Sequence, residues 1–229
     1  MRSSKLLLLL VLIGSPCVTA QDMTVVWKLE SVFTMPESAT FDSSAQFIFV
    51  SNVNEYAKDG NGFISRVSID GSDVEIRWLE GLDSPTGMAV YDGLLYFADF
   101  DSLVVADIAS AQILNRYVAP DANPSLNDVA ISPEGDVFVS GSASNSIYLL
   151  RQEQLQLWRH DDELLALANG LYVDGDLLLH GGRYWNVFDR HTGELVSDAL
   201  RPMPSLEDID GITRNICGSY LLSLIQDDR

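Results

Sequence analysis

Short apolar runs recur along this chain in pairs, and a turn rich in glycine joins the two members of most pairs. Four segments show the pattern most clearly: they begin at Thr86, Asn127, Asn169 and Asp210 and read TGMAVYDGLLYFAD, NDVAISPEGDVFVS, NGLYVDGDLLLHG and DGITRNICGSYLLS. A fifth, ESATFDSSAQFIFVS, begins at Glu37. Because a tight hairpin needs turn residues that tolerate positive φ, such as Asp92 and Gly93, each segment predicts an antiparallel hairpin.

The hairpins recur with a regular period. Their first residues lie 49, 41, 42 and 41 positions apart. Further apolar runs follow within a period, at residues 146–150 and 155–158, and again at 185–189 and 195–196. A unit of about four strands that recurs every 40 to 50 residues or so is typical of a propeller blade. We therefore predict an all-β fold, a β-propeller of which this sequence holds about four and a half blades, with residues 161–168 in a loop.

By the same pattern we expect the final blade to be incomplete. Only 19 residues follow Asp210, which is enough for one hairpin without outer strands. Residues 24–33 predict a strand that precedes the first hairpin, as expected of an outer strand that closes a final blade. Open sheet edges invite aggregation, so we expect the sequence to be a propeller that is truncated at its C-terminus or frameshifted.

Residues 1–20 have the pattern of an export signal. Arg2 and Lys5 precede an apolar run at residues 6–13, and small residues around Ala20 form a cleavage site. The run is too short to cross a bilayer as a helix, so no stable membrane insertion is expected after cleavage. The mature domain is then residues 21–229, periplasmic or secreted, with Cys17 removed and Cys217 left without a disulfide partner.

The charge of the chain limits its partners. The formal net charge is −19, and loss of Arg2 and Lys5 with the signal would make the chain more negative still. Nucleic acids and anionic membranes are bound through clustered Lys and Arg, so neither is expected as a partner.

One register of the repeat carries polar side chains. In a propeller the innermost strands run along a central channel, so the residues that open the five hairpins should converge on one mouth of it. These residues are Glu37, Thr86, Asn127, Asn169 and Asp210. Carboxylate and amide oxygens suit hard cations such as Ca²⁺, Mg²⁺ or Mn²⁺. The alternative is that Asn and Asp stand here because they form turns, although Glu37 is a poor turn former.

The same segments resemble a known family. Pro36-Glu37-Ser38, Leu126-Asn127-Asp128, Ala168-Asn169-Gly170-Leu171 and Ile209-Asp210-Gly211-Ile212 are similar, in order, to the blade signatures of the SMP-30/gluconolactonase family. The resemblance covers residues 27–222 and implies a six-bladed propeller with one divalent cation held by Glu37, Asn169 and Asp210. Ca²⁺ is the expected cation, with Mn²⁺, Mg²⁺ or Zn²⁺ as alternatives.

The resemblance also implies a reaction. The cation would polarise the carbonyl of a small lactone or ester, and Asp210 would act as general base. Asn127 would act on the substrate or on water beside the cation. Thr86 is a weaker candidate for a substrate contact, and so is His180, which ends the second strand of its hairpin.

Two differences from the sugar-lactonase members of this family narrow the expected substrate and branch. Sugar-lactonase members usually carry Arg two residues before the position of Asn127, where this chain has Ser125. The stretch NEYAKDGNG at residues 54–62 resembles an exported bacterial branch of the family more than it resembles the sugar-lactonase members. We predict a metal-dependent hydrolase with a small-molecule substrate. A non-catalytic binding propeller of the NHL type and an inactive truncated fragment are the alternatives.

Overall fold

The computed structural model describes residues 25–30, 32–196, 208–215 and 218–225. The predicted signal peptide, Cys17 and Cys217 lie outside these residues. The described part is built of strands in five antiparallel sheets, and it contains no helix that could span a membrane.

Three of the sheets have four strands each, in simple sequential order. The first holds β1 (Pro36–Asp42), β2 (Phe47–Asn52), β3 (Gly62–Ser68) and β4 (Val74–Leu82); the second holds β5 (Pro85–Tyr91), β6 (Leu94–Asp99), β7 (Ser102–Asp107) and β8 (Gln112–Val118); the third holds β9 (Leu126–Ile131), β10 (Val137–Gly141), β11 (Ser146–Arg151) and β12 (Gln154–His160). A three-stranded sheet follows with β13 (Leu171–Asp174), β14 (Leu177–His180) and β15 (Asn186–Asp189), and a two-stranded one with β16 (Ile209–Arg214) and β17 (Tyr220–Leu224).

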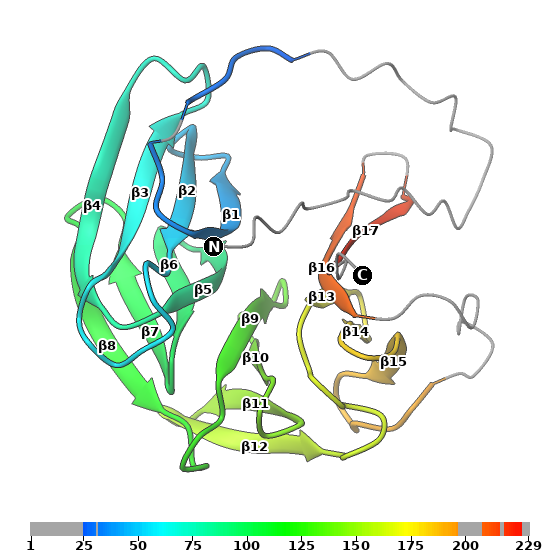
Figure 1. Cartoon of the computed structure of the whole chain (residues 1–229). Coiled ribbons are helices and arrows are strands. Elements are labelled where there is room, and N and C mark those ends of the chain that lie inside the picture. Colours follow the sequence, from blue (N-terminus) through cyan, green and yellow to red (C-terminus); the bar gives the residue numbers. More distant parts are fainter. Residues whose placement is uncertain (1–24, 31, 197–207, 216–217, 226–229) are drawn as a thin grey trace.

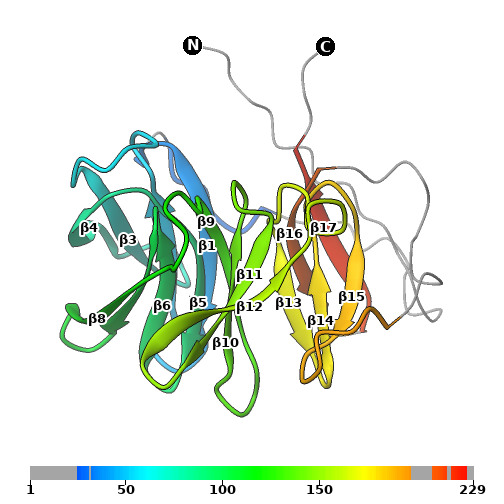
Figure 2. The same ribbon diagram turned by 90° about the horizontal axis from the view of Figure 1, so that it is seen from below.

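The sheets stand side by side around a central axis, like the blades of a propeller (Figures 1 and 2). The first strand of each sheet contacts the first strand of the next, from β1 to β5, β9, β13 and β16. Each outermost strand, such as β4 or β8, lies at the rim (Figure 1). The predicted all-β propeller is confirmed, and so are the predicted blades within the described residues.

The hairpin turns follow the predicted chemistry. Asp92 and Gly93, between β5 and β6, have φ angles of 49° and 76°. Two consecutive positive φ angles define the turn that matches the twist of a two-residue hairpin, and Asp and Gly tolerate them. This turn makes Tyr91 the partner of Leu94 and so sets the register of the whole hairpin.

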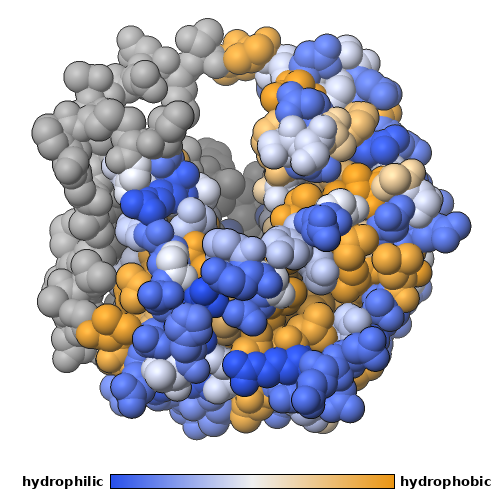
Figure 3. Space-filling view, turned by 180° about the vertical axis from the view of Figure 1, so that it is seen from behind, coloured by the Kyte–Doolittle hydropathy of each residue, from blue (hydrophilic) through white to orange (hydrophobic). Residues whose placement is uncertain are grey.

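Apolar side chains fill the space between neighbouring blades. Because successive strand residues point to opposite faces, Phe138 of β10 packs toward the fourth blade while Val139 packs toward the second. Trp158 contributes to the same interface, with its ring edge-on to Phe138 at 5.5 Å and to Phe188 at 6.0 Å. Seen from behind, hydrophilic residues cover much of the described surface and apolar residues form separate patches (Figure 3).

The segment before the first blade differs from the prediction. Residues 25–30 and 32–33 form no strand. Trp27 instead donates its indole N–H to the Ile69 carbonyl at 2.8 Å and covers Gly71, where a Cβ would lie 2.7 Å from the indole ring. Val25 and Val26 are 79% and 89% exposed. One aromatic anchor on the β3–β4 turn therefore replaces the strand pairing that the apolar pattern predicted.

Two smaller predictions have mixed outcomes. Residues 161–168 form turns and no helix, as expected of a loop. The strand predicted at residues 195–196 is reduced to a single bridge between Phe188 and Leu195.

A buried arginine ties the third blade to the fourth. Arg190, only 5% exposed, donates to Glu134 at 2.6 Å, to Asp136 at 2.8 Å and to the Gly175 carbonyl at 2.8 Å. Glu134 and Asp136 lie in the β9–β10 turn, so one guanidinium joins the turns of two adjacent blades.

We expect Arg190→Ala to lower the free energy of unfolding by about 2 kcal/mol, because it leaves the Gly175 carbonyl without this donor and two carboxylates without their cation. The partly solvated carboxylates limit the loss. Urea denaturation measures the change. Arg151→Ala, at an exposed position, should stay within about 0.5 kcal/mol of the parent. Equal effects of the two substitutions would contradict the assigned link.

Candidate functional site

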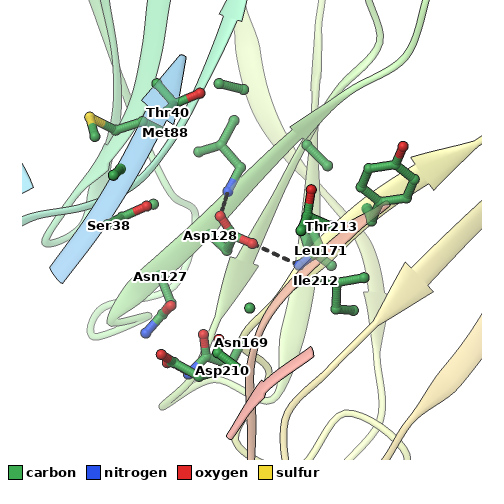
Figure 4. Close-up of a pocket in the computed structure, with 18 of the residues that line it drawn as sticks. Ser38, Thr40, Met88, Asn127, Asp128, Asn169, Leu171, Asp210, Ile212 and Thr213 are labelled. Atoms are coloured by element: carbon green, nitrogen blue, oxygen red, sulfur yellow. Dashed lines mark hydrogen bonds between the residues drawn. The ribbon is translucent and has the colours of Figure 1, made fainter. Parts of the chain in front are cut away.

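The predicted polar residues meet at the centre of the propeller. A cavity of about 1040 Å³ is lined by residues of β1, β5, β9, β13, β16 and β17. Four of the five residues that open the hairpins line it: Glu37, Asn127, Asn169 and Asp210. In Figure 4, the side chains of Asn127, Asn169 and Asp210 gather at one end of the cavity. The register of the repeat therefore brings these groups together as expected.

Thr86 and His180 are not among the lining residues. Thr86 is 3% exposed, and its hydroxyl donates to the Leu126 carbonyl of the next blade at 3.3 Å. His180 has no exposed surface, and its ring lies 6.3 Å from that of Phe188 in the core. The place of His180 at the end of a strand predicted that it would face the channel. Its side chain instead lies in the packing between blades. This arrangement argues against substrate contacts by either residue.

Glu37 sits in an environment that disfavours its charge. Its Oε2 atom is buried and has no hydrogen-bond partner among the described residues. Burial, and to a smaller extent the negative charges of Asp210 and Asp128, together raise the pKa of Glu37 from 4.5 to about 8. A buried carboxylate oxygen without a donor is costly, so this atom is available to a ligand that supplies positive charge.

Asp210 and Asn169 form a pair across two blades. The Asn169 side-chain N–H donates to Asp210 Oδ1 at 3.1 Å. Burial raises the pKa of Asp210, while this hydrogen bond lowers it. The pairing uses the Asn169 nitrogen and one oxygen of Asp210. The Asn169 carbonyl oxygen and the second carboxylate oxygen of Asp210 are left as candidate ligands.

Asp128 is a fifth acidic or amide group of the cavity, and it is not among the site residues predicted from the sequence. One of its oxygens accepts the backbone N–H of Val129 at 2.8 Å, and the other accepts that of Leu171 at 2.8 Å in the next blade (Figure 4). Burial raises the pKa of Asp128 to about 7, against the effect of both hydrogen bonds. The carboxylate therefore joins two blades while it lines the cavity.

A comparison of the repeats could have drawn attention to Asp128. The position after each hairpin opening is Ser38, Gly87, Asp128, Gly170 and Gly211, so only this blade carries an acid there. Gly87 makes the exception possible, because a Cβ at that position would overlap Asp128 Oδ1. The acid and the glycine that accommodates it are 41 positions apart, one repeat period.

The donor set suits a hard cation. Within the described part of the chain, no three His, Cys, Asp or Glu residues are grouped closely enough to hold a metal by themselves. Any metal here would depend on amide oxygens as well as on Glu37 and Asp210. Oxygen-only donors of this mixture are those that Ca²⁺ and Mg²⁺ take, usually with water completing the shell. The unpartnered Glu37 oxygen and the crowded acids fit such an ion.

Comparison with known proteins identifies the fold and no family. No family model matches the chain, and no curated protein matches it. Among solved structures, two crystal structures of virginiamycin B lyase from Staphylococcus aureus are similar. One gives a TM-score of 0.60 at 13% identity over 83% of this chain and 63% of that one. The other, a catalytically inactive variant with quinupristin, gives 0.59 at 13% identity over 86% and 80%.

A nidogen/laminin complex is also similar, with a TM-score of 0.57 at 14% identity over 71% of this chain and 62% of that one. The computationally designed Ika8 protein gives 0.54 at 13% identity over 79% and 52%. The chain thus spans only about half to two thirds of the length of most of these structures. At these identities the likeness supports the propeller fold alone.

The raised pKa of Glu37 predicts a pH dependence of stability for the protein in chelator. The folded state holds the Glu37 proton up to a pH of about 8, whereas the unfolded state releases it near 4.5. The free energy of unfolding should therefore fall as the pH rises between these values.

Glu37→Gln should reduce that fall, because the amide carries no charge to release. Urea denaturation in EDTA at several pH values measures it. Glu194→Gln, at an exposed position, should keep the slope of the parent. An unchanged slope in Glu37→Gln would show that Glu37 is not buried among acids.

Proposed function

We propose that this propeller is a divalent-cation-dependent hydrolase of a small lactone or ester, with its site at the central cavity. The observation that carries the proposal is the buried, unpartnered Glu37 oxygen beside Asp210, in one cavity with Asn127 and Asn169. The resemblance of the four blade signatures to the SMP-30/gluconolactonase family supports the same function.

Each residue has a role in this proposal. Glu37, Asn169 and Asp210 would hold the cation, most simply Ca²⁺. When bound, the ion would polarise the carbonyl of the substrate and stabilise the negative charge that develops on its oxygen. Asn127, which lines the same end of the cavity, would orient that carbonyl through its amide.

Asp210 is the proposed general base. Burial raises its pKa above that of an ordinary aspartate, which makes the carboxylate a better proton acceptor. Asn169 restrains one oxygen of Asp210 and so fixes the plane of the carboxylate. Asp210 would take a proton from the water that attacks the carbonyl. As the bond between the carbonyl carbon and the alcohol oxygen breaks, Asp210 would return this proton to the alcohol oxygen, which opens the ring of a lactone or releases the alcohol of an ester.

The proposed substrate is not a sugar-acid lactone. Ser125 stands where sugar-lactonase members of the resembling family usually carry Arg. We also propose that the protein is exported to the periplasm or out of the cell, because residues 1–20 have the pattern of an export signal.

Calcium titration and hydrolysis assays test this proposal together. The purified chain should bind one Ca²⁺ by calorimetry and hydrolyse γ-butyrolactone or p-nitrophenyl acetate in Ca²⁺ but not in EDTA. Asn169→Ala should weaken Ca²⁺ binding. Asp210→Asn should lower the turnover number by about 100-fold or more, as expected on loss of a general base.

Asp176→Asn serves as the control, because it removes one acid from the exposed β13–β14 turn. It should leave both measurements unchanged. A chain that binds no Ca²⁺, Mn²⁺, Mg²⁺ or Zn²⁺ and hydrolyses no lactone or ester contradicts the proposal and favours a binding propeller.

A further inference from the structure

The charges that line the central cavity are of one sign. Three carboxylates line it, those of Glu37, Asp128 and Asp210. No Lys, Arg or His belongs to its lining among the described residues. A ligand that enters this cavity therefore meets fixed negative charge and no side chain that could pair with an anion.

The nearest basic side chains along the chain are engaged elsewhere. Arg214, which ends β16, donates to Asp174 at 2.7 Å and to the Gly218 carbonyl at 3.1 Å. Lys58, two residues after Tyr56 of the cavity, pairs with Asp101 at 2.7 Å. Turning either side chain inward would break an ion pair, so neither is free to neutralise an anionic ligand.

Asp128 differs from the other two acids in what holds it. Glu37 has an unpartnered oxygen and Asp210 has a second oxygen free of the Asn169 amide, so both can turn to a cation. Both oxygens of Asp128 accept backbone N–H groups, one from its own strand and one from the next blade. Two such donors hold the carboxylate in place and offset part of the effect of burial on its pKa.

The charge balance then favours one class of ligand. A divalent cation would neutralise the charges of Glu37 and Asp210, and above a pH of about 7 the ionised Asp128 leaves one negative charge facing the cavity. Leu171, Ile212 and Thr213 of the lining lie on one side of Asp128 (Figure 4). Charges act over longer distances in partly desolvated surroundings than in water.

We infer that the cavity accepts uncharged or cationic ligands and rejects anionic ones, and that Asp128 is the residue that sets this preference. Where this inference concerns the substrate, it rests on the proposed function: the lactone or ester would be one without a carboxylate or phosphate group. The preference for uncharged or cationic ligands itself does not require that the protein be an enzyme.

Three ligands of nearly equal shape test the inference: benzamidinium, benzamide and benzoate, which are cationic, neutral and anionic. Their dissociation constants are measured by ligand-observed NMR on the full chain at low salt, in EDTA so that no bound cation attracts the carboxylate of benzoate, and at a pH of about 9, where Asp128 is ionised. Benzamidinium should bind at least as tightly as benzamide. Benzoate should bind at least about fivefold more weakly than benzamide, and high salt should shrink this ratio.

Asp128→Asn should bring the benzoate-to-benzamide ratio at least about threefold closer to one, as one fixed charge is removed. Asp73→Asn, which removes an exposed acid of the first blade, should leave the ratio unchanged. An unchanged ratio in Asp128→Asn overturns the role of Asp128. If that variant does not fold, the salt dependence of the parent decides whether fixed charge causes the selection.

Benzoate binding as tight as benzamide binding overturns the inference, and so does a failure of both benzamide and benzamidinium to bind at millimolar concentration. Repeating the series in Ca²⁺ separates this inference from the proposed function. The same order in EDTA and in Ca²⁺, without Ca²⁺ binding or hydrolysis, supports charge selection and contradicts the hydrolase. Ca²⁺-dependent hydrolysis, together with benzoate binding in EDTA as tight as benzamide binding, supports the hydrolase and contradicts charge selection.

Discussion

The packing of each sheet against the next is the constraint on which the site depends. An isolated four-stranded blade has two apolar faces and cannot bury both by itself. Stacking buries Phe138 toward one neighbour and Val139 toward the other, and it repeats this arrangement around the axis. The first strand of every blade is thereby placed at the centre, so residues separated by a whole repeat become neighbours.

That convergence has an energetic cost, because it gathers like charges. Glu37, Asp128 and Asp210 share a cavity with no basic side chain on its described lining, and the pKa of each is raised. Burial is the largest cause for all three, and mutual repulsion adds to it for Glu37 and Asp128. Such an arrangement weakens folding near neutral pH unless something offsets it. A bound cation would do so for Glu37 and Asp210, while Asp128 is compensated by two backbone N–H groups.

The sequence was informative where the structure repeats and less so where it does not. The period of the hairpins predicted the blades, and the register predicted that Glu37, Asn127, Asn169 and Asp210 would meet. Asp128 was missed because its place depends on Gly87 of another blade, a contact that no local pattern records. Arg190 lies 56 residues from Glu134, and its link could be seen only once the blades were stacked. His180 and residues 25–30 were misjudged because strand position and apolar content do not say which way a side chain points or what a segment pairs with.

The cation claim can be tested most directly by crystals of the chain grown in Ca²⁺ and measured at a wavelength where calcium scatters anomalously. We predict one calcium peak in the central cavity, with oxygens of Glu37, Asn169 and Asp210 roughly 2.3 to 2.6 Å from it, as in other calcium sites. A cavity without a peak, or a peak held by other residues, would contradict it.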